Sequence, residues 1–272
     1  MNKITNKRML KRTVLGAICG DICGSTYEFD FKYNSEIHFI REGSNFTDDS
    51  VMTLAVLKSL KEKDWRSKNW ANDVLIPNMV KLGTKYPDRG YGGMFMQWLK
   101  DENRQPYNSF GNGSAMRTSP VPFFCNNREE VLKLSEIVAS VTHNHEEGIK
   151  GAQAVSIAIW DAIHGMTPKE IKKDIEKTFD YDLSRRYDKI KETYHFESSC
   201  QKSVPESIIC SLISRSTIGV LYKAIGLRGD ADTMACISMS IAVNLTSVKQ
   251  NFNLNRAFKY LTPDLKEIID KD

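Results

Sequence analysis

The sequence predicts an all-α fold, on three observations. Apolar residues recur three or four positions apart through most of the chain, the spacing that places side chains on one face of a helix. Strand patterns are nearly absent, and residues 38–40 are the single short candidate. No internal repeat and no hinge rich in proline, glycine or serine divides the chain. Residues 1–272 are therefore expected to form one compact domain of many helices.

Helices are expected wherever the apolar spacing persists. Asn144 and Glu147 have the spacing of a capping box and are expected to open one long helix, and Pro168 is typical of a first helical position. Residues 180–205 are polar and aromatic without a clear period, which favours an ordered excursion on the surface. The expected helices are residues 10–24, 51–60, 74–82, 94–99, 131–141, 144–163, 168–179, 206–225, 233–243 and 264–269.

The first expected helix has a face without side chains. Gly16, Gly20 and Gly24 lie four residues apart, so they share one side of the helix. Bare backbone on one face invites close packing against another element. We expect this face to pack closely against such an element.

Composition and charge exclude several classes of protein. The chain has 272 residues with 41% hydrophobic and 26% charged residues, which is ordinary for a globular protein. No apolar run approaches the ~20 residues of a membrane span, and residues 14–19 are too short for a signal peptide, so a cytoplasmic protein without membrane association is expected. The net charge of +4 includes no basic stripe with interleaved aromatics, so nucleic acid is not an expected partner except as a modified substrate. The six cysteines form no C-x-x-C pair and are expected to be reduced.

Two acidic clusters stand at expected helix starts. Thr47, Asp48, Asp49 and Ser50 directly precede an apolar helix, where one cap and one acid would satisfy the helix end. Two adjacent carboxylates repel each other unless a cation lies between them, and hard cations such as Mg²⁺ take carboxylate and hydroxyl oxygens.

The second cluster repeats this chemistry near the other end of the chain. Asp230 and Asp232 follow Gly229 and precede Thr233 at another helix start. A capped helix explains either cluster alone. Both together favour a shared metal centre, in which one cluster from each end clamps a pair of cations about 3.5–4 Å apart.

Other polar positions could complete such a site. Asp21 and Glu28 lie among small and apolar residues, and each could be a surface acid or a carboxylate near the metals. The turn around Gly111, Asn112, Gly113 and Ser114 exposes backbone N–H groups that suit phosphate or ribose oxygens, although it could also be only a tight turn. His143 and His145 lack a third ligand for zinc nearby; His143 could instead cap a helix or line a sugar pocket.

Taken together, these segments resemble the ADP-ribosylglycohydrolase family, which includes dinitrogenase reductase-activating glycohydrolase. The resemblance covers nearly the whole chain and keeps the family's order: the glycine-rich opening helix with its trailing acid, the first Asp motif, the Gly-Asn-Gly loop with Met116 and Arg117, the Thr-His segment and the second Asp motif. It implies the compact all-α fold of that family and two Mg²⁺ ions, with Mn²⁺ as a substitute. The implied metal ligands are Thr47, Asp48, Asp49, Asp230, Asp232 and Thr233.

The resemblance also implies the remaining site residues. Glu28 would lie beside the distal ribose and, with Asp48 and Asp49, form the candidate catalytic set. Gly111, Asn112, Gly113, Ser114 and His143 would bind the substrate. Two positions depart from the family pattern: Arg228 stands where a glycine is usual, and Met239 stands where a small residue is usual, which is expected to change the pocket wall.

The resulting hypothesis is a Mg²⁺-dependent hydrolase that cleaves the glycosidic bond between ADP-ribose and a modified acceptor. The substrate would be an ADP-ribosylated protein or a small ADP-ribosylated molecule, and a monomer is expected. The acceptor atom and the acid or base role of Glu28 stay open. The alternatives are a catalytically weak ADP-ribose-binding regulator of the same fold, another metal-dependent hydrolase such as a phosphoesterase, and a purely structural helical protein.

Overall fold

The computed structural model describes residues 3–29 and 37–271 and is all-α, as predicted. Within these residues no strand forms, and only two isolated bridges occur. The α-helices are α1 (Lys3–Gly24), α2 (Asp48–Glu62), α3 (Ile76–Lys85), α4 (Gly93–Lys100), α5 (Arg128–Ser140), α6 (Glu146–Ile163), α7 (Pro168–Phe179), α8 (Tyr187–Thr193), α9 (Cys200–Leu212), α10 (Thr217–Gly226), α11 (Ala231–Ala242), α12 (Asn255–Phe258) and α13 (Pro263–Asp270). A π-helical turn, η1 (Ala71–Leu75), leads into α3, and short 3₁₀ turns lie at η2 (Asn112–Ser114) and η3 (Val121–Phe124).

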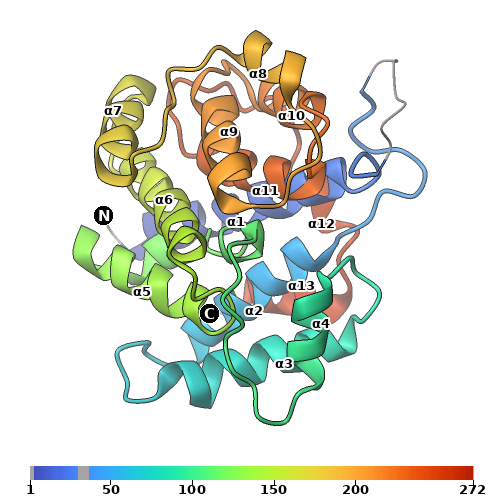
Figure 1. Ribbon diagram of the computed structural model, residues 1–272, viewed down its shortest axis with the longest axis vertical. Helices are drawn as coiled ribbons and strands as arrows, with labels where there is room; N and C mark the ends of the chain where they lie inside the picture. The colour runs from blue at the N-terminus through green and yellow to red at the C-terminus, as the bar shows by residue number, and fades with distance from the viewer. Residues whose placement is uncertain (1–2, 30–36, 272) are drawn as a thin grey trace.

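Helices α1 and α11 form the centre of the molecule, and both are largely buried (Figure 1). Helices α8, α9 and α10 lie on one side of this pair, and α2, α3, α4 and α13 lie on the other. The buried apolar residues join into one continuous core. No described helix is long and apolar enough to cross a membrane.

The glycine face of α1 packs directly on α11, as predicted. A Cβ atom added at Gly20 would lie 2.1 Å from the carbonyl oxygen of Ala235, and one at Gly24 would lie 2.4 Å from that of Ala231. Neither distance leaves room for a methyl group, so only glycine permits this approach. The contact brings the C-terminal half of α1 against the start of α11.

Several local predictions were wrong. Residues 38–40 are not a strand, because the Tyr27 phenol occupies both backbone groups of His38, at 3.1 Å from its oxygen and 2.9 Å from its nitrogen. The expected helix 206–225 is two helices, and Ser216 caps the second through the N–H of Gly219. The cap of α6 is His145 rather than Asn144, whose side-chain oxygen accepts from Asn108 N at 2.7 Å.

Candidate metal centre and substrate cavity

The first acidic cluster forms the start of α2. Thr47 is the N-cap, and its hydroxyl accepts from the N–H of Asp49 at 3.4 Å. Asp48 and Asp49 fill the first helical turn, where the helix dipole favours negative charge. Asp49 is buried, whereas Asp48 is half-buried and lines a cavity.

Asp21 of α1 fastens this helix start in place. Its carboxylate accepts hydrogen bonds from Thr47 N at 3.0 Å, from Thr47 Oγ1 at 2.7 Å and from Ser50 N at 3.1 Å. The Ser50 hydroxyl donates a further short bond to it. Asp21 is fully buried, so these donors replace the hydrogen bonds to water that burial removes.

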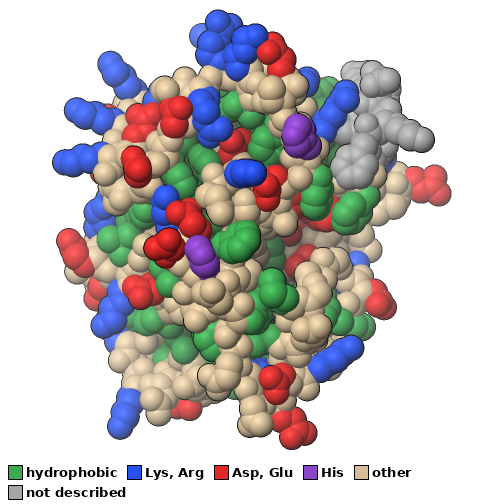
Figure 2. All heavy atoms as spheres, viewed as in Figure 1, with side chains coloured by type: hydrophobic (Ala, Val, Ile, Leu, Met, Phe, Trp, Pro, Cys, Tyr) green, Lys and Arg blue, Asp and Glu red, His purple; other side chains and the backbone are tan. Residues whose placement is uncertain are grey.

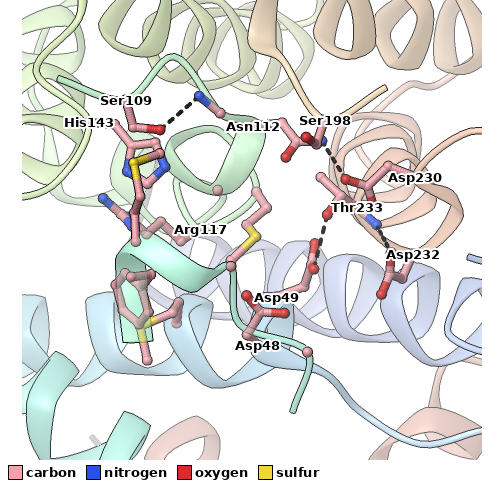
Figure 3. A pocket seen from close by; sticks show the side chains of 18 of the residues that line it. Asp48, Asp49, Ser109, Asn112, Arg117, His143, Ser198, Asp230, Asp232 and Thr233 are labelled. Carbon is pink, nitrogen blue, oxygen red and sulfur yellow. Dashed lines mark hydrogen bonds between the residues drawn. The ribbon is translucent and has the colours of Figure 1, made fainter. Parts of the chain in front are cut away.

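The second cluster forms the start of α11 and meets the first. Asp230 occupies the N-cap position, and Asp232 accepts from the N–H of Thr233 at 2.9 Å. The Thr233 hydroxyl donates to Asp49 Oδ2 at 3.1 Å, across 184 residues of sequence (Figure 3). The predicted convergence of the two clusters is therefore present in the structure.

Two groups of carboxylates are spaced to hold cations. Asp21, Asp49 and Asp232 place one oxygen each within 4.8 Å of one another, and so do Glu28, Asp230 and Asp232. Asp232 belongs to both groups. Buried Asp49 Oδ1 has no hydrogen-bond partner, which is the state expected of a carboxylate oxygen that faces a cation. The donor set is entirely oxygen and therefore fits a hard divalent ion such as Mg²⁺.

The grouping differs from the predicted ligand set. Asp21 and Glu28 belong to it, although sequence analysis left Asp21 between a surface and a metal role and placed Glu28 beside the ribose. Asp48 does not, and it lines the cavity beside Gly90. Of the two predicted hydroxyl ligands, Thr47 donates to Asp21 and Thr233 donates to Asp49. Which of these residues ligate a metal stays a prediction.

Crowding of carboxylates perturbs their protonation. Burial, followed by the charges of neighbouring carboxylates, raises the pKa values of Asp48, Asp49 and Asp232 well above their ordinary value. Burial raises the pKa of Asp21 to about 6 despite its hydrogen bonds. For Glu28, burial and then the charges of Asp230 and Asp21 raise the pKa to about 7. A divalent cation would oppose these shifts by favouring the ionised carboxylates.

The glycine-rich loop closes the other side of the site. Asn112 Nδ2 donates to Asp230 Oδ2 at 2.9 Å, which ties the loop to the second acidic cluster. Gly111 and Gly113 line the cavity, and Ser114 instead turns its hydroxyl to the carbonyl of Gly148 in α6 at 2.7 Å. The substrate contacts predicted for the four loop residues stay predictions.

The segment before α9 supports this loop. Asn112 N donates to Ser198 O at 2.8 Å, and Cys200 N donates to Phe110 O at 2.8 Å. Residues 180–205 were expected to be only a surface excursion, yet Phe196 and Ser198 line the cavity. No sequence pattern indicates their role, because the segment has no apolar period and the glycine-rich loop that it contacts lies 86 or more residues away in sequence.

These elements enclose a cavity of about 360 Å³. Its interior holds the acidic clusters and His143, and Tyr107, Ser109 and Arg117 complete its wall. Figure 2 shows the hollow on this face, with acidic side chains inside and hydrophobic side chains at the rim. The rim includes the exposed Phe29, Met94 and Phe196. A pocket of this size is typical of a small-molecule site, and many of its lining residues are charged or polar.

Comparison with known proteins gives consistent matches. A family model described as ADP-ribosylglycohydrolase matches residues 3–242. The chain is 28% identical over 144 residues to "ADP-ribosylhydrolase ARH3" of Gallus gallus, covering 48% of this chain and 38% of that protein. It is 25% identical over 256 residues to the protein of the same name from Bos taurus, covering 72% of this chain and 69% of that protein. The match thus spans well under half of the avian relative.

A solved structure supports the shared fold. The chain superposes on a protein described as "ADP-ribosylglycohydrolase-related protein complex" with a TM-score of 0.73 at 17% identity. The superposition covers 97% of this chain and 96% of that chain. At this identity the likeness concerns the fold alone, and the activity must be argued from the site.

Proposed function

The chain belongs to the ADP-ribosylglycohydrolase family, and on that premise we propose that it is a Mg²⁺-dependent hydrolase that releases ADP-ribose from a modified acceptor. The observation that carries the proposal is the convergence of carboxylates from α1, from the turn after it, from α2 and from α11 beside a cavity that the glycine-rich loop also lines. A ribose with its diphosphate offers vicinal hydroxyls to the carboxylate groups and phosphate oxygens to the glycine-rich loop.

The acidic clusters would hold the cations. Asp49 and Asp232, with Asp21, Glu28 and Asp230 in reach, offer the oxygen ligands, and Thr233 fixes the Asp49 carboxylate through its hydroxyl. Bound Mg²⁺ would supply Lewis-acid polarisation of the ribose hydroxyls and of a water. Asp48, half-buried at the cavity wall, is positioned to contact the ribose or to complete the ligand set.

Glu28 is the proposed group for proton transfer. It lines the cavity and is only half-buried, so its carboxyl group can reach both the substrate and solvent for proton exchange. It would protonate the departing acceptor atom or accept a proton from the attacking water. Both roles need the same position beside the anomeric carbon.

The loop would orient the rest of the substrate. Gly111 and Gly113 let a diphosphate approach the backbone closely, since neither carries a side chain toward the cavity. The Asn112 side chain donates a hydrogen bond to Asp230, so it sets the distance between the loop and the acidic clusters. This arrangement would hold the ribose over the carboxylates and provide the orientation that lowers the barrier.

The decisive experiment is a panel of substrates carrying ADP-ribose on arginine, on serine, on a nucleic-acid base and on a small guanidine compound. Release of free ADP-ribose is measured with Mg²⁺, with Mn²⁺ and with EDTA. Asp232→Asn should lower the rate more than about a hundredfold, because even outer-shell partners of a metal typically cost 10–100-fold. The matched control is Asp73→Asn, an exposed aspartate of η1 outside the cavity, which should leave the rate unchanged.

Three outcomes would refute the proposal: no release from any substrate, full release in EDTA, or an unimpaired Asp232→Asn variant. Cleavage of generic phosphate esters alone would indicate a phosphoesterase instead. The monomeric state and cytoplasmic location that we propose are checked separately, by light scattering and by localisation in cells.

A second candidate is a regulator that binds ADP-ribose with little turnover. It is motivated by two departures from the family pattern: Arg228, which adopts a left-handed backbone conformation (φ 61°) two residues before Asp230, and the buried Met239 of α11. Calorimetry that shows tight binding of ADP-ribose, with no turnover across the substrate panel, would support it. Rapid release from any substrate would eliminate it.

A further inference from the structure

Arg117 is a buried cation at the back of the cavity. Its side chain is 1% exposed. Its Nη2 donates to the carbonyl oxygen of Val138 at 2.9 Å and to Thr142 Oγ1 at 2.7 Å. Burial lowers its pKa only to about 10, so the guanidinium stays protonated at neutral pH and acts purely as a donor. The Thr142 hydroxyl must therefore accept from it.

The Thr142 proton then needs an acceptor of its own. His143 Nδ1 lies 2.7 Å from Thr142 Oγ1, and the carbonyl of Ala139 lies farther away, at 3.4 Å. The Tyr107 phenol also lies beside Thr142, and it can donate its own proton to the threonine oxygen, which leaves the threonine proton for His143. The shortest path therefore directs the threonine proton to His143 Nδ1.

A ring that accepts at Nδ1 carries its proton on Nε2 when it is neutral. His143 is 6% exposed, and burial followed by the charge of Arg117 lowers its pKa well below the ordinary value, so the ring is neutral. Its Nε2 faces the glycine-rich loop: Cβ atoms added at Gly113 and Gly111 would lie 3.3 Å and 3.5 Å from it. The N–H is thus directed to the part of the cavity where oxygen-rich substrate would bind (Figure 3).

We propose that Arg117 and Thr142 are positioning residues that fix His143 in the Nε2–H form, so that it donates a hydrogen bond to a phosphate or ribose oxygen of ADP-ribose. The inference rests on the proposed function for the identity of the ligand. The opposite tautomer would present a lone pair, which repels a phosphate oxygen and can only accept from a ribose hydroxyl. A neutral donor also spares the site a second buried positive charge beside Arg117.

The test combines a tautomer measurement with a binding measurement. Long-range ¹H–¹⁵N spectra of the histidine-labelled protein report the protonation of each ring nitrogen, and His143→Gln identifies the signal among five histidines. We expect Nε2–H and unprotonated Nδ1 in the wild type from about pH 6 to 8. Thr142→Val should mix the tautomers and weaken ADP-ribose binding by about tenfold in calorimetry, while Thr142→Ser should restore both.

The matched control is Ser135→Ala, which removes a buried hydroxyl of α5 that donates to the carbonyl of Val131, away from Thr142 and His143. It should leave the tautomer and the affinity unchanged. A wild-type His143 with its proton on Nδ1 would overturn the inference without any variant. So would a Thr142→Val protein that binds ADP-ribose as tightly as the wild type, which leaves the proposed function intact. Failure of the wild type to bind ADP-ribose would overturn both.

Discussion

Replacing Gly20 by alanine tests the central contact of the fold. The added Cβ would lie 2.1 Å from the Ala235 carbonyl oxygen, whereas ordinary contact begins at 3.4 Å, so α1 and α11 must separate locally by about 3.4 − 2.1 = 1.3 Å. Because the obstacle is backbone, no side-chain rotation can relieve it. Overpacking of this kind costs about 3 kcal/mol at the upper end of its usual range. The better helix propensity of alanine returns up to about 1 kcal/mol.

The net loss of about 2 kcal/mol should lower the melting temperature by roughly 4–8 °C for a chain of this size. Urea unfolding followed by circular dichroism measures the free energy directly. The variant should also bind Mg²⁺ more weakly, since Asp21 follows Gly20 in sequence and Asp232 lies at the start of α11.

The control for this experiment is Gly93→Ala, at the start of α4, where an added Cβ meets no atom within 4 Å. Its stability should equal or slightly exceed that of the wild type. A Gly20→Ala protein with unchanged stability and unchanged Mg²⁺ affinity would refute the close approach of α1 and α11.

Three further perturbations have defined outcomes. Asp49→Asn removes one buried like charge, so the metal-free variant should unfold at a higher temperature than the metal-free wild type near pH 8. It should also lose the stabilisation that Mg²⁺ gives the folded protein, about 2.7 kcal/mol at a hundred times Kd. A variant that Mg²⁺ stabilises as much as the wild type would contradict the assignment of Asp49 as a metal ligand. Burial raises the pKa of Asp161 to about 7 against the charge of Arg128, so the stability present at acid pH is lost as pH rises through 7. Asp161→Asn should flatten this decline by at most roughly 4 kcal/mol in urea titrations from about pH 4 to 8, and an unchanged slope would count against it. Arg228→Gly should stabilise the protein by about 1 kcal/mol, because glycine adopts a positive φ without strain, and a loss of stability would show that the arginine side chain contributes more than its backbone costs.

Helices with a strong apolar period could be predicted from the sequence, whereas the short break within the expected helix 206–225 could not. Helix α7 has the predicted bounds, because Thr167, Pro168 and Glu170 together specify its start. The break between α9 and α10 falls at the polar residues Ser214, Arg215 and Ser216. It follows from the Ser216 cap and from a backbone hydrogen bond that Thr217 N donates to Lys249 O. That partner is remote in sequence, so a local pattern cannot reveal it.

The candidate site, like the fold, could be predicted from the sequence only in part. The two acidic clusters could be recognised from the sequence, because two carboxylates at a helix start are more than capping needs. The importance of Asp21 could not be recognised, because nothing near a single acid in a helix indicates its partners. Its role depends on donors from Thr47 and Ser50 that only the fold brings to it.

The two departures from the family pattern bear on which function the site supports. Arg228 follows the end of α10, where its N–H donates to the carbonyl of Ile225 at 3.1 Å and its φ is 61°. This is the position at which helices commonly end with a glycine, so the departure is a backbone cost of about 1 kcal/mol rather than a loss of ligands. Met239 is fully buried in α11, two turns beyond Asp232. Neither change removes a carboxylate from the site, so weak catalysis would have to come from displacement of the start of α11. Arg228→Gly would correct such a displacement, whereas Asp232→Asn would not.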